Sequence, residues 1–164
     1  MTVSVRVLQD AERGSVAERL RERWGDEIVI ARGMAHDASL LLGFIAEEEN
    51  ECVGLATYEI RGGECELVTL DSYREGTGVG SALLAAIGNV AYGQGCKRLV
   101  VVTTNDNVAA LGFYQRHGFV LTALRSGAVS KARLLKPSIP ELGRDGIPIR
   151  DELELSLALP LDGS

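Results

Sequence analysis

Long unbroken apolar runs are absent from this sequence of 164 residues. No stretch approaches the roughly 18 consecutive apolar residues that a helix needs to cross a bilayer. The amino terminus also lacks the basic leader and apolar segment of a secretory signal. We therefore expect a cytoplasmic protein that does not have a membrane as a partner.

Cysteine is scarce, and its spacing matches no framework. Cys52, Cys65 and Cys96 are odd in number and form neither a CxxC pair nor a Cys/His pattern. A disulfide scaffold needs paired cysteines, and a zinc site needs closely spaced ligands. We expect no metal, and we interpret all three cysteines as small buried apolar side chains.

An excess of basic residues is also missing. The chain has 17 Lys and Arg against 23 Asp and Glu, a net charge of -6. A nucleic-acid surface needs a basic patch to displace counterions, so we expect no nucleic-acid partner. The acidic balance weakly favours a cationic substrate. The length is typical of one domain, and we expect a single domain over residues 1–164.

The apolar pattern predicts strands interleaved with helices. Strands are predicted at 3–8, 40–47, 52–60, 64–71, 97–104, 119–125 and 151–159. Helices are predicted at 15–24, from about 79 to 93, 107–117 and 128–135. Short turns join the three strands between 40 and 71 into an antiparallel meander, whereas the strands at 64–71 and 97–104 flank a helix and should be parallel. The sequence therefore predicts a mixed α/β fold.

The first predicted helix carries its own start and stop signals. Ser15 and Glu18 fit a capping box, and Gly25 fits a helix end. Trp24 shares a face with apolar residues of this helix, so we expect it to be a core anchor. Residues 26–38, which include His36, are expected to be irregular.

Three glycines, Gly76, Gly78 and Gly80, come between a strand and a helix. Backbone N–H groups that open a helix form an anion site, and glycines let a phosphate approach them closely. Ser81 follows Gly80 directly, where a P-loop would have its lysine, and no G-x-G-x-x-G spacing is present. The loop could equally be a turn that lets the helix pack on the sheet.

A second motif follows the next predicted strand and reads N-V-A-A-L-G-F-Y-Q-R-H-G-F over residues 107–119. Together with the glycine loop it resembles the GNAT superfamily of acyl-CoA N-acyltransferases, whose later helix reads N-x-x-A-x-x-x-Y-x-x-x-G-F. The matching positions are Asn107, Ala110, Tyr114, Gly118 and Phe119. The resemblance covers nearly the whole chain and is weakest at 25–40 and 131–150.

One position of the glycine loop departs from the family. The pyrophosphate loop R/Q-x-x-G-x-G/A of the family is filled here by E-G-T-G-V-G, residues 75–80. Glu75 therefore replaces the Arg or Gln of the family, and Arg74 lies one place early. An acidic side chain would repel a diphosphate unless it points to solvent. The family contacts the diphosphate mainly through backbone N–H groups, so the resemblance still implies binding.

The resemblance implies a mostly antiparallel central sheet of about six to seven strands, flanked by helices, with a splayed parallel pair at the cofactor site. It implies acetyl-CoA as cosubstrate and no metal. The backbone N–H of Leu70 matches the position that holds the thioester carbonyl. The implied cofactor-binding residues are Leu70, Glu75, Thr77, Gly78, Val79, Gly80, Ser81, Asn107 and Ala110.

The resemblance also implies two catalytic residues, Tyr114 and Glu66. The phenol of Tyr114 would protonate the departing thiolate. Amines are mostly protonated at neutral pH, so a general base is useful. The family often uses a carboxylate on the strand before the glycine loop, which here is Glu66; its rivals are Glu64, Glu59 and His36.

The expected function is transfer of an acetyl group from acetyl-CoA to a primary amine of a small molecule or protein, by direct attack in a ternary complex. The first alternative is a module that binds acyl-CoA without turnover. A weaker one is a different phosphate-ligand binder that uses only the glycine loop. The proline-marked segment 131–150 lines the acceptor site, forms a homodimer contact or is a surface ornament.

Overall fold

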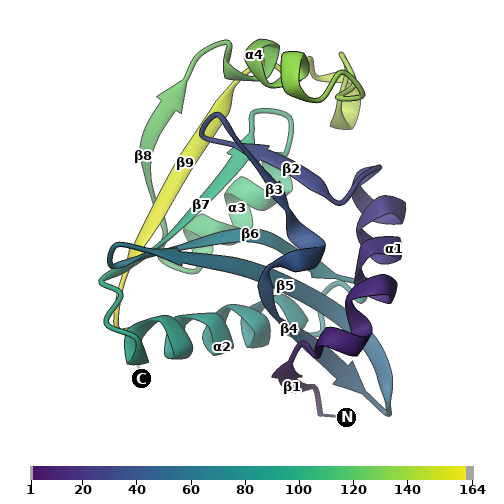
Figure 1. Ribbon diagram of the computed structural model, residues 1–164. Coiled ribbons are helices and arrows are strands. Elements are labelled where there is room, and N and C mark those ends of the chain that lie inside the picture. Colours follow the sequence, from purple (N-terminus) through teal and green to yellow (C-terminus); the bar gives the residue numbers. More distant parts are fainter. Residues whose placement is uncertain (1, 162–164) are drawn as a thin grey trace.

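The computed structural model describes residues 2–161 and is built on a seven-stranded sheet (Figure 1). The strand order is β1-β4-β5-β6-β7-β9-β8. The strands are β1 (Ser4–Val7), β4 (Leu42–Glu48), β5 (Glu51–Arg61), β6 (Glu64–Ser72), β7 (Arg98–Thr104), β8 (Val120–Arg125) and β9 (Glu152–Ala158). The α-helices are α1 (Arg13–Trp24), α2 (Val79–Gly93), α3 (Val108–Arg116) and α4 (Ala128–Leu135).

The sheet is mostly antiparallel, with one parallel pair, as predicted. β4, β5 and β6 form the antiparallel meander, and β6 and β7 are parallel across α2. Leu99, Val100 and Val101 of β7 are buried because the strand lies inside the sheet with layers on both faces. The predicted mixed α/β class and the parallel βαβ pair are therefore confirmed. Within residues 2–161, no helix is both long enough and apolar enough to cross a membrane.

The prediction that residues 26–38 are irregular was wrong. This region forms a hairpin of β2 (Ile28–Ala31) and β3 (Met34–Asp37), a separate two-stranded sheet. Branched apolar residues favour the first strand, and Arg32 and Gly33 turn with φ of 51° and 74°, the geometry of a tight hairpin turn. Alternation over only four residues per strand was too short a signal to identify it.

The first helix begins before Ser15. α1 starts at Arg13, and the capping box forms between Gln9 and Glu12, at the 3-10 turn Asp10–Glu12 that precedes α1. The Ser15 hydroxyl instead donates to the Glu12 carbonyl at 2.9 Å. Trp24 is 42% exposed and is not a core anchor, because the buried stripe of α1 consists of Val16 and Leu20. The predicted capping box and the predicted burial of Trp24 are both corrected.

Two apolar clusters hold the layers together. The larger lies between the sheet and α2 and includes Leu83 and Ile87, both fully buried. The smaller lies under α1 on the other face of the sheet and includes Leu20. Cys65 and Cys96 are buried in the larger cluster as expected, while Cys52 is only partly buried. The sheet is thus fixed from both sides.

The parallel pair does not stay together along its whole length. β6 and β7 pair from Glu64 and Arg98 only as far as Leu67 and Val101. At that point the register of β6 against β5 shifts by one residue, and Val68 is the extra residue of a β-bulge. A bulge bends its strand and increases the local twist. The two strands therefore separate toward their carboxyl ends.

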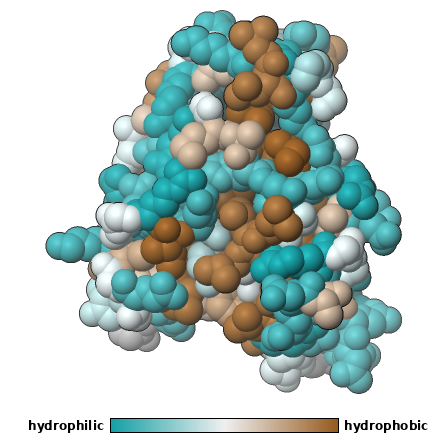
Figure 2. Space-filling view, viewed as in Figure 1, coloured by the Kyte–Doolittle hydropathy of each residue, from teal (hydrophilic) through white to brown (hydrophobic). Residues whose placement is uncertain are grey.

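Removal of core side chains from α2 should cost stability in proportion to the cavity that it leaves. Leu83→Ala should lower the free energy of unfolding by about 2–5 kcal/mol, because Leu83 is fully buried. The matched control is Leu134→Ala in α4, where the leucine is 84% exposed. In the space-filling view, hydrophobic side chains gather at the α4 end of the face shown (Figure 2). The effect of Leu134→Ala should stay within about 0.5 kcal/mol. Urea unfolding measures both values, and similar values for the two variants would contradict this packing.

Candidate active site

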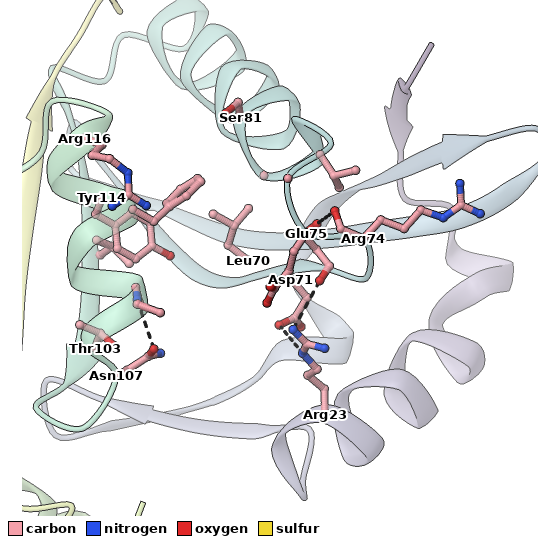
Figure 3. A pocket seen from close by; sticks show the side chains of 18 of the residues that line it. Arg23, Leu70, Asp71, Arg74, Glu75, Ser81, Thr103, Asn107, Tyr114 and Arg116 are labelled. Atoms are coloured by element: carbon pink, nitrogen blue, oxygen red, sulfur yellow. Dashed lines mark hydrogen bonds and ion pairs between the residues drawn. The ribbon is translucent and has the colours of Figure 1, made fainter. Parts of the chain in front are cut away.

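A cavity of about 530 Å³ lies where β6 and β7 separate. It is bounded by the glycine loop, the first turn of α2, one side of α3 and the end of α1. Figure 3 shows side chains of α1, β6 and α3 around this space, among them Arg23, Leu70, Asp71, Asn107 and Tyr114. Most of the site residues expected from the sequence line it, namely Leu70, Glu75, Gly78, Val79, Gly80, Ser81, Asn107, Ala110 and Tyr114.

The glycine loop leaves free backbone donors at the start of α2. Gly78 caps the helix with φ of 81°, a conformation that glycine adopts without strain. The first amide to bond back along the helix is that of Ala82, to the Gly78 carbonyl at 3.0 Å. The N–H groups of Val79, Gly80 and Ser81 precede it and have no partner within the helix. Together with the helix dipole they suit a phosphate.

Glycine is needed at position 80 for a different reason. A Cβ atom there would come within 3.1 Å of the Phe113 ring of α3. At Gly76 and Gly78, by contrast, a Cβ would meet nothing within 4 Å. The loop is therefore packed against α3 on one side and open to a ligand on the other.

The backbone of Leu70 faces the gap between the strands. The Tyr73 amide donates to the Val53 carbonyl of β5 at 2.9 Å. Alternate residues of an antiparallel strand direct their backbone groups to the same side, so Asp71 also faces β5. Leu70 then directs its N–H toward β7, which has already separated from β6. This amide can donate to a ligand that enters between the two strands.

The α3 helix places Tyr114 in the cavity. Asn107 caps the helix, and its side-chain oxygen accepts from the Ala110 amide at 3.2 Å. Tyr114 is 7% exposed and packs edge-on against Phe113 and Phe119. Burial, followed by the nearby charge of Asp71, raises the pKa of Tyr114 well above its ordinary value. The phenol therefore stays protonated at neutral pH and can act as a proton donor.

A hydrogen-bonded histidine joins the start of α2 to the end of α3. His117 Nδ1 lies 2.8 Å from the Phe113 carbonyl, which can only accept, so Nδ1 carries the proton. His117 Nε2 lies 2.8 Å from the Ser81 hydroxyl. In the neutral imidazole this nitrogen accepts from Ser81. The pair holds the two motifs in fixed relation beside the cavity.

The three loop residues around the first glycine do not offer a cation to a ligand. Arg74 forms ion pairs with Glu48 and Glu51. Glu75 is exposed. Thr77 does not line the cavity, and its hydroxyl donates to the Arg74 carbonyl at 2.7 Å. Anion binding at this loop therefore depends on the backbone amides.

Asp71 is a carboxylate of the cavity that the sequence reasoning missed. It is only 4% exposed, accepts from the Trp24 indole N–H at 2.8 Å and lies 3.6 Å from Arg23 Nε. Burial raises the pKa of Asp71 above its ordinary value, although the Trp24 hydrogen bond and the Arg23 charge oppose this. It directly follows Leu70 at the carboxyl end of the strand, which was the signal that could have found it.

Glu66 lies outside this cavity. It lines a separate hollow of about 20 Å³ together with Glu59, Glu64 and two arginines. Its carboxylate binds Arg32 Nη2 at 2.5 Å and lies 3.8 Å from His36 Nε2. All four base candidates from the sequence thus belong to a polar cluster beneath the β2–β3 hairpin.

The β-bulge explains how Asp71 comes to share a face with Glu66. Their positions differ by five, and an odd difference would place their side chains on opposite faces of a regular strand. The extra residue, Val68, restores the same face. Glu66 then meets the β2–β3 hairpin, while Asp71 meets the end of α1. No pattern in the sequence announces this bulge.

Three arginines of the cavity carry no motif that would have identified them. They are Arg23 at the end of α1, Arg116 in α3 and Arg144 in the segment 131–150. Trp24 also lines the cavity. Through Arg144, the segment 131–150 contributes to the cavity wall. A place at the acceptor site was one of the three alternatives that the sequence left open for this segment.

Comparison with known proteins adds independent information. The model of the Acetyltransferase (GNAT) family matches residues 6–119. The uncharacterized protein YdhI of Bacillus subtilis (strain 168) is 44% identical over 137 residues, which are 82% of this chain and 85% of that protein.

Solved structures of low identity share the fold. An IAA acetyltransferase from Bacillus cereus ATCC 14579 superposes with a TM-score of 0.68 at 22% identity, covering 96% of this chain and 100% of that one. A GNAT family acetyltransferase from Elizabethkingia anophelis, with acetyl-CoA bound, superposes with a TM-score of 0.68 at 18% identity. The match covers 96% of this chain and 98% of that one. From the family match and the identity to YdhI, the chain belongs to the acetyltransferase (GNAT) family.

Proposed function

We propose that the chain transfers an acetyl group from acetyl-CoA to a primary amine, by direct attack in a ternary complex. The observation that carries the proposal is one cavity that joins three kinds of group. These are the free amides at the start of α2, the Leu70 amide and the Tyr114 phenol. The Elizabethkingia anophelis relative in this fold binds acetyl-CoA, which supports the choice of donor.

The residues present fit the proposed cosubstrate. The amides of Val79, Gly80 and Ser81 would bind the diphosphate, and the open space before Gly76 and Gly78 admits it. Leu70 N–H would donate to the thioester carbonyl and stabilise the charge that develops on its oxygen. Acetyl-CoA supplies an activated acyl carbon; the chain supplies the position, the donors and the proton transfers.

Two side chains are assigned the proton transfers. Asp71 would accept a proton from the amine as the N–C bond forms, directly or through water. Tyr114 would donate its proton to the sulfur as the C–S bond breaks. Asp71 is favoured over Glu66 because it lines the cavity, while Glu66 is held by Arg32 outside it. The raised pKa of each group suits its role.

Tyr114→Phe should lower kcat by roughly 10²-fold with acetyl-CoA affinity retained, because only the proton donor is lost. Thiol release from acetyl-CoA with an amine panel measures kcat, and calorimetry measures affinity. The matched control is Tyr92→Phe, an exposed tyrosine on α2 that is 54% accessible, which should behave like the parent. Equal kcat for Tyr114→Phe and the parent would remove Tyr114 from the mechanism. Coenzyme binding without thiol release from any amine would favour the alternative, a binding module without turnover.

Asp71→Asn should lower kcat/KM at pH 7 by roughly 10²- to 10⁴-fold, the usual contribution of a general base. The amide oxygen still accepts from Trp24, so the local structure is preserved. Below its raised pKa, Asp71 is protonated and cannot accept a proton. The kcat/KM of the parent should therefore rise with pH through that pKa, in addition to the rise that comes from deprotonation of the amine. The Asn variant should show only the second rise.

Glu66→Gln serves as the comparison for Asp71→Asn and should stay near the parent in kcat/KM. Its free energy of unfolding is measured in parallel, because the change also breaks the bond to Arg32. A large loss of kcat/KM in a stably folded Glu66→Gln, with none in Asp71→Asn, would assign the base to Glu66 instead.

A further inference from the structure

One arginine of the cavity forms no ion pair with any residue from 2 to 161. Arg144 lies in the 3-10 turn Arg144–Gly146 of the segment 131–150 and lines the cavity. It interacts electrostatically with Asp71. Its guanidinium makes no hydrogen bond or ion pair with any residue in the described range 2–161. The Arg144 guanidinium and the buried Asp71 carboxylate thus line the same cavity.

The backbone of Arg144 is held firmly. Its amide donates to Asp106 Oδ2 at 3.2 Å, and Asp106 is 6% exposed. Gly143 packs directly on the same carboxylate, where a Cβ would collide with it. Asn105 fixes the return of the segment by accepting from the Arg150 and Asp151 amides, both at 2.9 Å. The end of β7 therefore sets the position of Arg144.

Arg133, in the same segment, shows a different use of a guanidinium. It donates to the carbonyls of Ile139, Pro140 and Ile149 and so ties α4 to the rest of the segment. Arg144 has no such structural task. Arg144 is exposed at the cavity and has no ion pair among residues 2–161, so its guanidinium is available to a ligand there.

Around Asp71 the cavity carries two arginines, Arg23 and Arg144, although the net charge of the chain is negative. Asp71 already has Arg23 as a partner at 3.6 Å and Trp24 as a donor. Arg144 adds a further positive charge, and it forms no ion pair with a carboxylate in the described part of the chain. A purely cationic acceptor would meet this charge as a repulsion, whereas an anionic group would be attracted. The net charge of -6 is a sum over the whole chain and does not describe this cavity.

We propose that the acceptor is a primary amine that also carries a carboxylate, and that Arg144 binds this carboxylate while Asp71 faces the amine. This rests on the proposed acetyl transfer. A guanidinium matches a carboxylate with two parallel N–H donors, which gives both affinity and orientation. The partly exposed Trp24 ring provides an apolar wall for the body of the acceptor. Arg144 is thus a residue that determines specificity and takes no part in proton transfer.

The test uses matched sets of amines: amino acids, their amides and the corresponding decarboxylated amines, with thiol release from acetyl-CoA as the readout. The parent should prefer the carboxylates by about 10-fold or more in kcat/KM, the scale of one charge-assisted contact. Arg144→Gln should remove that preference by raising KM for the carboxylates alone. Arg144→Lys should restore part of it. Acetyl-CoA affinity, measured by calorimetry, should be equal in all variants.

Arg150→Gln is the matched control, since Arg150 lies in the same segment and pairs with Asp151 outside the cavity. Equal or better use by the parent of the amines that lack a carboxylate would overturn the inference. An equal loss for every amine in Arg144→Gln, or weakened acetyl-CoA binding, would also overturn it. If no amine releases thiol, the acetyl transfer itself fails. In that case, calorimetry measures the affinity of the amino acids and of their amides for the complex of the protein with coenzyme A. Equal affinity for the two sets overturns the proposed role of Arg144.

Discussion

The separation of β6 from β7 is the constraint on which the rest of this structure depends. The strands pair only as far as Leu67 and Val101, and the bulge at Val68 coincides with the point where they part. A buried hydrogen bond between the hydroxyls of Thr57 and Thr69, 2.7 Å long, joins β5 to β6 just beyond the bulge. β6 therefore stays with β5 while β7 leaves, and the backbone of Leu70 is exposed to the resulting space.

Two helices complete that space from the same side of the sheet. α2 supplies backbone amides, and α3 supplies a phenol. Their relation is fixed by contact of the Phe113 ring with Gly80 and by the hydrogen bond between Ser81 and His117. This packing also buries Tyr114. Burial raises the pKa of Tyr114 because an environment without water disfavours the charged phenolate. The phenol of Tyr114 is thus kept protonated by the same contacts that position it.

Charge is organised locally in this chain. At the β2–β3 hairpin, Arg32 forms ion pairs with both Glu64 and Glu66. These two carboxylates of β6 therefore hold the hairpin on the sheet. In the cavity, by contrast, Arg144 interacts electrostatically with Asp71 but forms no ion pair with any residue from 2 to 161. A charge summed over the whole sequence cannot distinguish these two regions, since opposite charges cancel in the sum but not in space. Net charge therefore weakly favoured a cationic acceptor, whereas the proposal of a carboxylate on the acceptor rests on one local arginine.

The sequence by itself determined the mixed fold, the parallel pair, the glycine loop and the motif from Asn107 to Phe119, because these depend on local periodicity and on residues close along the chain. It did not determine the β2–β3 hairpin, whose strands are too short for a periodic signal, or the exposure of Trp24. Only the tertiary structure decided that Asp71 shares a cavity with Tyr114, while Glu66 faces Arg32. It also decided that Arg144 reaches the same cavity. The physical reason is that a one-residue bulge and an anchored loop place side chains through contacts between segments that are distant in the sequence.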